Sequence, residues 1–167
     1  MSILSAYCIN LEKRPDRWQA CIDNFSKNGF PIHVLQRWKA FEDSEFGALG
    51  CAKSHFLALA DFIGNRNEPF CLIFEDDFDF LQPWPVFVEK FNSLNALQVG
   101  WDVLMLSGTN TLAYTENLPG FARVVESNST SGYLFSRNYA KNLLACFANS
   151  VIQLQRVKDH EARQFWV

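Results

Sequence analysis

An apolar stretch that runs directly into a group of acids constrains this chain more than any other feature of its sequence. Between residues 70 and 80 the chain reads FCLIFEDDFDF. The nearly unbroken apolar run from Phe70 to Phe74 predicts a strand that is covered on both faces, in the centre of a sheet. The acids that follow are Glu75, Asp76, Asp77 and Asp79. Carboxylates crowded at a buried strand end repel one another and lose solvation, so this segment needs a compensating partner.

Predicted strands and helices alternate along the rest of the chain. Strands are expected over residues 5–11, 32–38, 70–74, 103–106, 121–125 and 133–135. Helices are expected from Pro15 to Asn28, up to about Gly64, from Pro83 onward and from Arg137 to about Ala148. Residues 107–120 are expected to form a polar loop, and residues 151–167 a strand or loop followed by a final helical turn. The order predicts an α/β three-layer sandwich with a mostly parallel central sheet, as one domain over residues 1–167.

Composition narrows the class of protein. The formal net charge is −3 and no basic run is present, which argues against a nucleic-acid partner. The five cysteines include no C-x-x-C pair, so we expect reduced, buried thiols and a reducing compartment. No secretory signal and no apolar run near the roughly 20 residues of a membrane span are found. We therefore expect a cytoplasmic protein without a transmembrane segment, and a peripheral membrane contact stays open.

A hard divalent cation is the common partner of carboxylates gathered at a strand end. Mg²⁺ and Mn²⁺ take oxygen ligands, often one or two carboxylates with phosphate and water. The alternative is an acidic turn that faces water. Phe78 and Phe80 favour the metal, because they limit how far the acids can turn to bulk solvent. Spacing leaves the ligands open, since Glu75 and Asp77 point to one side of an extended chain and Asp76 to the other.

Two further groups of polar residues accompany the acids. After the first predicted strand the chain carries Asn10, Arg14, Asp16 and Arg17. Arginines at a strand end near a helix start suit a diphosphate or a ribose, although surface ion pairing is the more common explanation of such a group. The segment GCAKSHFLAL carries Gly50, Ser54 and His55. Glycine lets a ligand approach the backbone and the other two offer hydrogen bonds, but a lone histidine is more often a structural partner.

Together these segments resemble a known family. INLEKRPDRW, GALGCAKSHFLAL, CLIFEDDFDF, WDVLMLSG and SGYLFSRNYAKNLL occur in the order and at the approximate spacing of glycosyltransferase family 25. That family comprises lipopolysaccharide-biosynthesis galactosyl- and glucosyltransferases related to the collagen galactosyltransferases. The resemblance covers roughly residues 5–165. It implies a GT-A-like, Rossmann-like fold, a nucleotide-diphosphate sugar donor, usually UDP-linked, and a divalent metal, usually Mn²⁺.

The resemblance also implies roles for particular residues. Glu75 and Asp77 would form the DxD pair, with Asp77 in direct contact with the metal and Asp76 near the ribose or behind the metal ligands. The residues that would line the nucleotide pocket are Asn10, Leu11, Arg14 and Arg17. Those that would approach the ribose and diphosphate of the donor are Gly50, Ser54 and His55.

A second set of implied roles lies near the C-terminus. Asp159 is the nearest match to a family aspartate, and we expect it to act as the base that deprotonates the acceptor, with Glu126 and Glu161 as substitutes. His160 would complete the metal sphere or contact the diphosphate. Family members commonly continue beyond the point that corresponds to Val167, so the resemblance implies a domain that is short at this end.

The expected function is transfer of a hexose, galactose or glucose, from a UDP-sugar to a hydroxyl of a glycan such as lipopolysaccharide, with inversion. The first alternative is a non-catalytic module that binds a nucleotide sugar or a glycan. A metal-dependent phosphoesterase or nuclease also needs grouped carboxylates. A two-carboxylate glycosidase is disfavoured, because its acids must flank a sugar from opposite sides.

Overall fold

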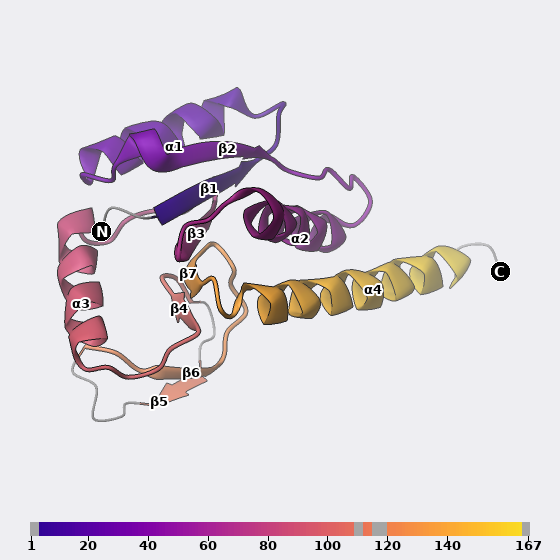
Figure 1. Cartoon of the computed structure of the whole chain (residues 1–167). Helices are drawn as coiled ribbons and strands as arrows, with labels where there is room; N and C mark the ends of the chain where they lie inside the picture. Colours follow the sequence, from indigo (N-terminus) through magenta and orange to yellow (C-terminus); the bar gives the residue numbers. More distant parts are fainter. Residues whose placement is uncertain (1–3, 109–111, 115–119, 165–167) are drawn as a thin grey trace.

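The computed structural model describes residues 4–108, 112–114 and 120–164, with side chains described as far as residue 160. Figure 1 shows a central sheet with helices packed against both of its faces. Within these residues no helix is both long enough and apolar enough to cross a membrane.

The central sheet has five strands in the order β2-β1-β3-β7-β4. Their bounds are β2 (Leu35–Lys39), β1 (Leu4–Asn10), β3 (Phe70–Glu75), β7 (Gly132–Ser136) and β4 (Val103–Met105). Strand β1 pairs in parallel with β2 and with β3, whereas β7 is antiparallel to both of its neighbours. A mixed α/β structure with a mostly parallel central sheet is therefore confirmed.

In the described part of the chain, four α-helices form the outer layers. Their bounds are α1 (Pro15–Lys27), α2 (Gly47–Asn65), α3 (Trp84–Ala96) and α4 (Ala140–Gln164). Helices α1 and α3 contribute Phe25, Trp84 and Phe91 to one core, and α2 contributes Leu59 and Phe62 to the other. Helix α4 packs on that second core beside α2.

Side chains of the central strand alternate between these two cores. Leu72 and Phe74 belong to the core under α1 and α3, and Cys71 and Ile73 to the core under α2 and α4. The period of two is that of an extended chain, and it explains why nearly every residue of this strand is apolar.

The structure differs from the predicted elements in three places. Residues Ile32–Val34 form a short 3-10 helix, η1, so the strand begins only at Leu35. The expected polar loop contains strand β5 (Leu112–Tyr114), which pairs with β6 (Arg123–Glu126) in a separate two-stranded sheet. The helix expected to end near Ala148 continues to Gln164, and the predicted strand or loop after it was wrong.

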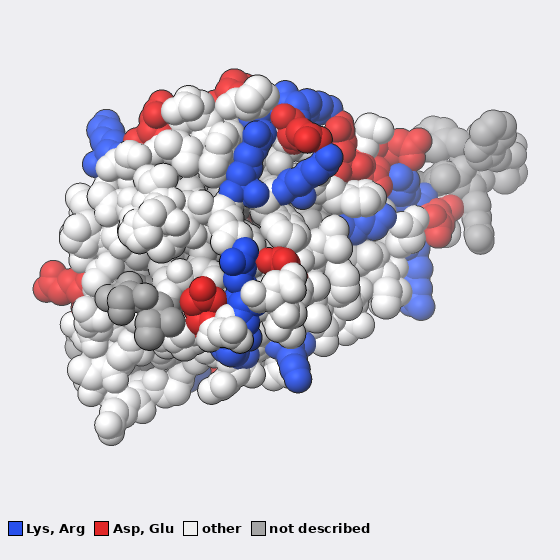
Figure 2. All heavy atoms as spheres, turned by 45° about the horizontal axis from the view of Figure 1, so that its top comes forward, with Lys and Arg blue, Asp and Glu red and all other residues white. Residues whose placement is uncertain are grey.

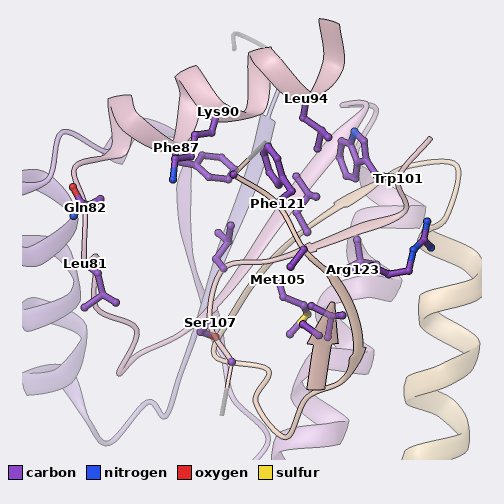
Figure 3. A pocket seen from close by; sticks show the side chains of 18 of the residues that line it. Leu81, Gln82, Phe87, Lys90, Leu94, Trp101, Met105, Ser107, Phe121 and Arg123 are labelled. Carbon is purple, nitrogen blue, oxygen red and sulfur yellow. The ribbon is translucent and has the colours of Figure 1, made fainter. Parts of the chain in front are cut away.

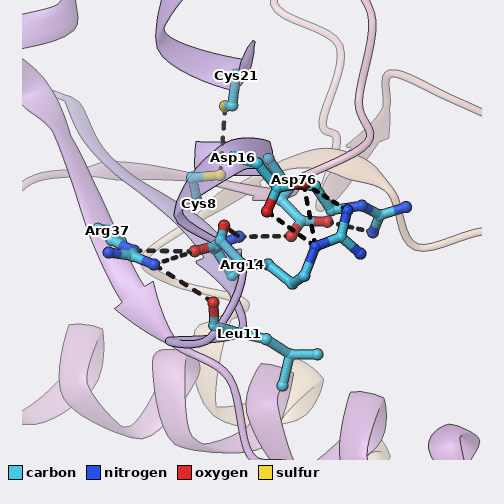
Figure 4. Close-up of polar contacts among 9 residues, drawn as sticks. Cys8, Leu11, Arg14, Asp16, Cys21, Arg37 and Asp76 are labelled. Carbon is cyan, nitrogen blue, oxygen red and sulfur yellow. Dashed lines mark hydrogen bonds and ion pairs between the residues drawn. The ribbon is translucent and has the colours of Figure 1, made fainter. Parts of the chain in front are cut away.

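The cysteines are all free thiols in the structure. Cys8, Cys21 and Cys71 are buried, Cys51 is partly exposed and Cys146 is exposed on α4. The expectation of buried thiols therefore fails for Cys146. The Sγ atoms of Cys8 and Cys21 lie 3.4 Å apart, at the contact of β1 with α1 (Figure 4).

Candidate functional site

Three strands end at one edge of the sheet and bring the predicted polar residues together. Ile9 is paired with Glu75 and Asn10 with Lys39, so β1, β2 and β3 reach this edge in register. After Glu75 the chain turns, and the Phe78 N–H donates to the Glu75 carbonyl at 3.1 Å. Phe78 then returns into the aromatic core, with its ring 4.8 Å from that of Phe74. The acids are thus held on a turn anchored at both ends.

Asp76 joins the two sequence segments that the resemblance places around a nucleotide. Its carboxylate accepts from Asn10 Nδ2 at 2.6 Å and from an Arg17 guanidinium nitrogen at 2.8 Å. Asn10 is buried, and its Oδ1 accepts from Arg37 Nε at 2.9 Å (Figure 4). The ends of β1, β2 and β3 are therefore linked by one polar network, in which the Asp76 charge is paired with Arg17.

Leu11 and Arg14 lie beside this network but do not contact the acids through their side chains. The Leu11 carbonyl accepts from Arg37 at 3.3 Å. Arg14 pairs with Asp16 at 2.7 Å, and the guanidinium holds the pKa of Asp16 at about 2. Both side chains of that pair are exposed, so Arg14 remains accessible to a ligand.

The side chain of Glu75 turns toward α2. Its contacts there were not predicted from the sequence. Its Oε1 accepts from Thr130 Oγ1 at 2.8 Å and lies 3.4 Å from His55 Nε2. The hydrogen bond with His55 holds the pKa of Glu75 below its usual range. The other ring nitrogen of His55 lies 2.9 Å from the Tyr133 hydroxyl. No pattern signalled Thr130, because it precedes β7 and reaches Glu75 only through the antiparallel pairing of β7 with β3.

Gly50 and Ser54 face the loop between β2 and α2. Ser54 Oγ donates to the Gly50 carbonyl and accepts from the Phe41 N–H, both at 2.7 Å. A Cβ added to Gly50 would lie 2.8 Å from the Phe41 carbonyl oxygen and 3.0 Å from the Asp43 nitrogen. These residues hold the loop against α2, and the structure does not bring them to the acids.

Asp77 is the acid without such partners. No side chain in the described part of the chain forms a hydrogen bond or ion pair with it. Desolvation and the neighbouring charge of Glu75 raise its pKa above the usual range. A carboxylate that is disfavoured as an anion and left unpaired fits the ligand set of a hard cation.

Asp159 and His160 are not brought to the acidic turn. Both are exposed on α4, which extends beyond α2 in Figure 1. Asp159 accepts from Gln155 at 2.9 Å, and neither residue forms a hydrogen bond or ion pair with Glu75, Asp76 or Asp77. Of the two substitutes, Glu126 is exposed on β6, and the side chain of Glu161 lies outside the described residues. The physical reason is the continuous α4, which replaces the strand or loop expected after Ala148.

A pocket of ≈ 960 Å³ lies next to Asp77, between α3 and the segment that leads into β6. Figure 3 shows aromatic and aliphatic side chains pointing into it, among them Phe87, Trp101, Phe121 and Met105. Its charged lining includes Asp79 and Asp102. Asp79, from the acidic cluster, and Asp102, which the sequence analysis did not select, therefore share the pocket with Asp77.

The protein surface carries charges of both signs. Figure 2 shows acidic and basic side chains lying next to one another on the face drawn. Exposed ion pairs include Lys13 with Glu42 and Lys39 with Glu12. Pairs of this kind contribute little to stability, because water and salt screen exposed charges.

The fold and the polar strand ends define an α/β protein with a candidate ligand site at the carboxyl edge of its sheet. No family model matches the chain, and no curated protein matches its sequence significantly. The assignment of an activity therefore depends on the sequence motifs and on the geometry of this site.

Proposed function

We propose that this protein is a metal-dependent glycosyltransferase of the family 25 type, which uses a UDP-hexose as donor and a glycan hydroxyl as acceptor. The observation that carries the proposal is the bridge from Asn10 and Arg17 to Asp76. It joins INLEKRPDR to FEDD at the carboxyl ends of neighbouring parallel strands, where α/β proteins bind nucleotides.

The residues present suit the parts of such a donor. Asp77, with Glu75 beside it, would hold the cation, which supplies Lewis-acid stabilisation of the departing diphosphate. Arg14 is exposed at the same strand end and can pair with phosphate oxygens. Asp76 is already neutralised by Arg17, so it is suited to accept a hydrogen bond from a ribose hydroxyl rather than to bind a cation.

The acceptor requires a base, and the structure supports other carboxylates than the one expected. Asp79 and Asp102 line the pocket beside Asp77, whereas Asp159 lies on α4. We therefore expect Asp102→Asn or Asp79→Asn to reduce transfer about 10²–10⁴-fold with donor affinity unchanged, the loss typical of a general base. Asp159→Asn is the matched substitution. If it alone showed that loss, Asp159 would be the base, as the family resemblance implies.

The first test is thermal stability with UDP, UDP-galactose and UDP-glucose, each with and without Mn²⁺. A ligand at a hundredfold excess over its dissociation constant stabilises the native state by about 2.7 kcal/mol. We expect a shift that needs both metal and nucleotide, that Asp77→Asn abolishes and that Asp23→Asn retains. Asp23 is an exposed acid on α1 and controls for the loss of one charge. A shift without metal dependence, or one that survives Asp77→Asn, would contradict the proposal.

A binding module without transfer is the second candidate, and the position of Asp159 favours it. If the residue that the resemblance implies as base is not at the site, the chain can hold a donor without activating an acceptor. Release of UDP from the bound UDP-hexose over a long incubation distinguishes the two. Steady release supports the transferase, and stable binding of intact donor supports the module.

A further inference from the structure

A separate group of potential metal ligands lies on the α2 side of the sheet. Cys51 and His55 are one helical turn apart on α2, and Glu75 reaches them from the end of β3. One ligand atom from each, a sulfur, an imidazole nitrogen and a carboxylate oxygen, lies within 4.8 Å of the other two. No other group of three or more such side chains converges in this way in the described part of the chain.

The hydrogen bond between His55 and Glu75 is a long one, and its length also fits two ligands of one shared ion. Their Nε2 and Oε1 atoms are 3.4 Å apart. Hydrogen bonds from N–H to oxygen are usually about 2.7–3.2 Å long. Two ligands at about 2.05 Å from a tetrahedral ion lie about 3.3 Å from each other.

The surroundings of His55 are those of a ligand held in place. Its side chain is fully buried, its ring stacks on Phe147 at 5.0 Å, and its Nδ1 lies 2.9 Å from the Tyr133 hydroxyl. Metal-binding histidines usually engage their second nitrogen in such a contact, which orients the first toward the ion. Glu75 is oriented in the same way by Thr130. Cys51 is partly exposed, which leaves this group accessible from solvent.

We propose that Cys51, His55 and Glu75 form a three-ligand site for Zn²⁺ or an ion of similar preference, with a fourth position left for water or an exogenous ligand. Thiolate and imidazole select such ions over Mg²⁺ and Mn²⁺. The site is distinct from the hard-cation site proposed at Asp77 and does not depend on glycosyl transfer. Glu75 is common to both, so an ion bound here would compete for that carboxylate.

Cobalt spectroscopy of the metal-stripped full chain tests this proposal without any activity measurement. Co²⁺ bound to a thiolate in four-coordinate geometry gives an intense charge-transfer band and strong visible bands. We expect one equivalent of Co²⁺ to produce both and one equivalent of Zn²⁺ to abolish them. Cys51→Ser should remove the charge-transfer band, and His55→Gln should weaken binding at least tenfold.

Two controls keep the outcomes separate. Cys146→Ser removes an exposed thiol elsewhere and should leave the spectrum unchanged, as should Asp77→Asn. Far-UV circular dichroism checks that each variant is folded, and Glu75→Gln replaces His55→Gln if burial makes the latter unfold.

Absence of the band in the wild type would overturn the proposal and leave a plain His55–Glu75 hydrogen bond. A band that survives Cys51→Ser would equally overturn it. Loss in Asp77→Asn alone would assign the ion to the other site.

Discussion

Consecutive acids acquire different chemistry here because the chain turns directly after the strand. Glu75 ends the extended segment and reaches Thr130 and His55, whereas Asp76 faces Asn10 and Arg17. Asp77 has no side-chain partner among the described residues, and its pKa is raised. In the EDD motif, Glu75 is therefore hydrogen-bonded, Asp76 is paired with an arginine, and Asp77 has no side-chain partner among the described residues.

The Asp76 network predicts unequal costs for its two donors. Asn10 is buried, so Asn10→Ala leaves Asp76 and Arg37 without that partner. We expect the free energy of unfolding to fall by about 1–3 kcal/mol. Arg17→Ala removes an exposed partner and should cost about 0–1 kcal/mol. Urea denaturation measures both, and equal losses would show that the burial of Asn10 does not matter.

The close contact between Gly132 and the ring of Phe78 allows a steric test of how the acidic turn is anchored. A Cβ added there would lie 2.4 Å from a ring carbon of Phe78, which anchors the turn in the core. Gly132→Ala should therefore destabilise the protein by about 1–3 kcal/mol, the usual cost of overpacking. The double variant with Phe78→Leu should lose less than the sum of the two single variants, because the smaller side chain makes room. Additive losses in a double-mutant cycle would contradict this account.

At the scale of elements, α4 is tied to the loop before α2 by Asp43, which is partly buried. Lys158 donates to Asp43 at 2.9 Å, and Asp43 also accepts from the Phe46 N–H at the start of α2. The bond with Lys158 is the largest cause of the lowered pKa of Asp43. The contact therefore connects α4 to the loop between β2 and α2, which Gly50 and Ser54 also hold in place.

This contact predicts a pH dependence of stability. An acid whose pKa is lowered by folding stabilises the native state above its ordinary value, here 3.8, and loses that contribution as pH falls through the lowered folded value. We expect Asp43→Asn to lower the melting temperature at pH 6 and to approach the wild type as the pH falls below the lowered folded pKa. Glu45→Gln is the control, because Glu45 also pairs with Lys158 but is 78% exposed. A difference that did not change with pH would exclude the ion pair as its source.

The length of α4 was readable in the sequence. Leu144, Phe147, Val151 and Leu154 recur at helical spacing and are partly buried, and no glycine or proline interrupts residues 140–164. The polar residues of its second half form the exposed face of a helix that packs on one side only, so they do not indicate an end at Ala148.

At the scale of the whole molecule, both cores share one sheet, so they should unfold together. Ile73 and Phe74 are neighbours in β3 that face opposite cores. We expect Ile73→Val to cost about 0.5–1.5 kcal/mol and Phe74→Leu about 0.5–3 kcal/mol. Each should shift a single transition seen alike by near- and far-UV circular dichroism. Separate transitions in either variant would show that one face folds independently.

The sequence by itself determined the layers of this protein. Apolar runs of strand length and helical stripes such as Trp18, Cys21, Ile22 and Phe25 reflect local periodicity, and local periodicity decides which faces are buried. The same pattern placed the acids at the carboxyl end of the central strand, whereas a shared site for Asn10, Arg17 and the acids was implied by the family resemblance.

Only the tertiary structure decided what each polar residue contacts. Thr130 and Tyr133 reach Glu75 and His55 because β7 is antiparallel to β3, and strand direction leaves no trace in a short apolar segment. Such contacts join residues far apart in the chain, and their geometry depends on packing between elements, which local sequence pattern does not encode.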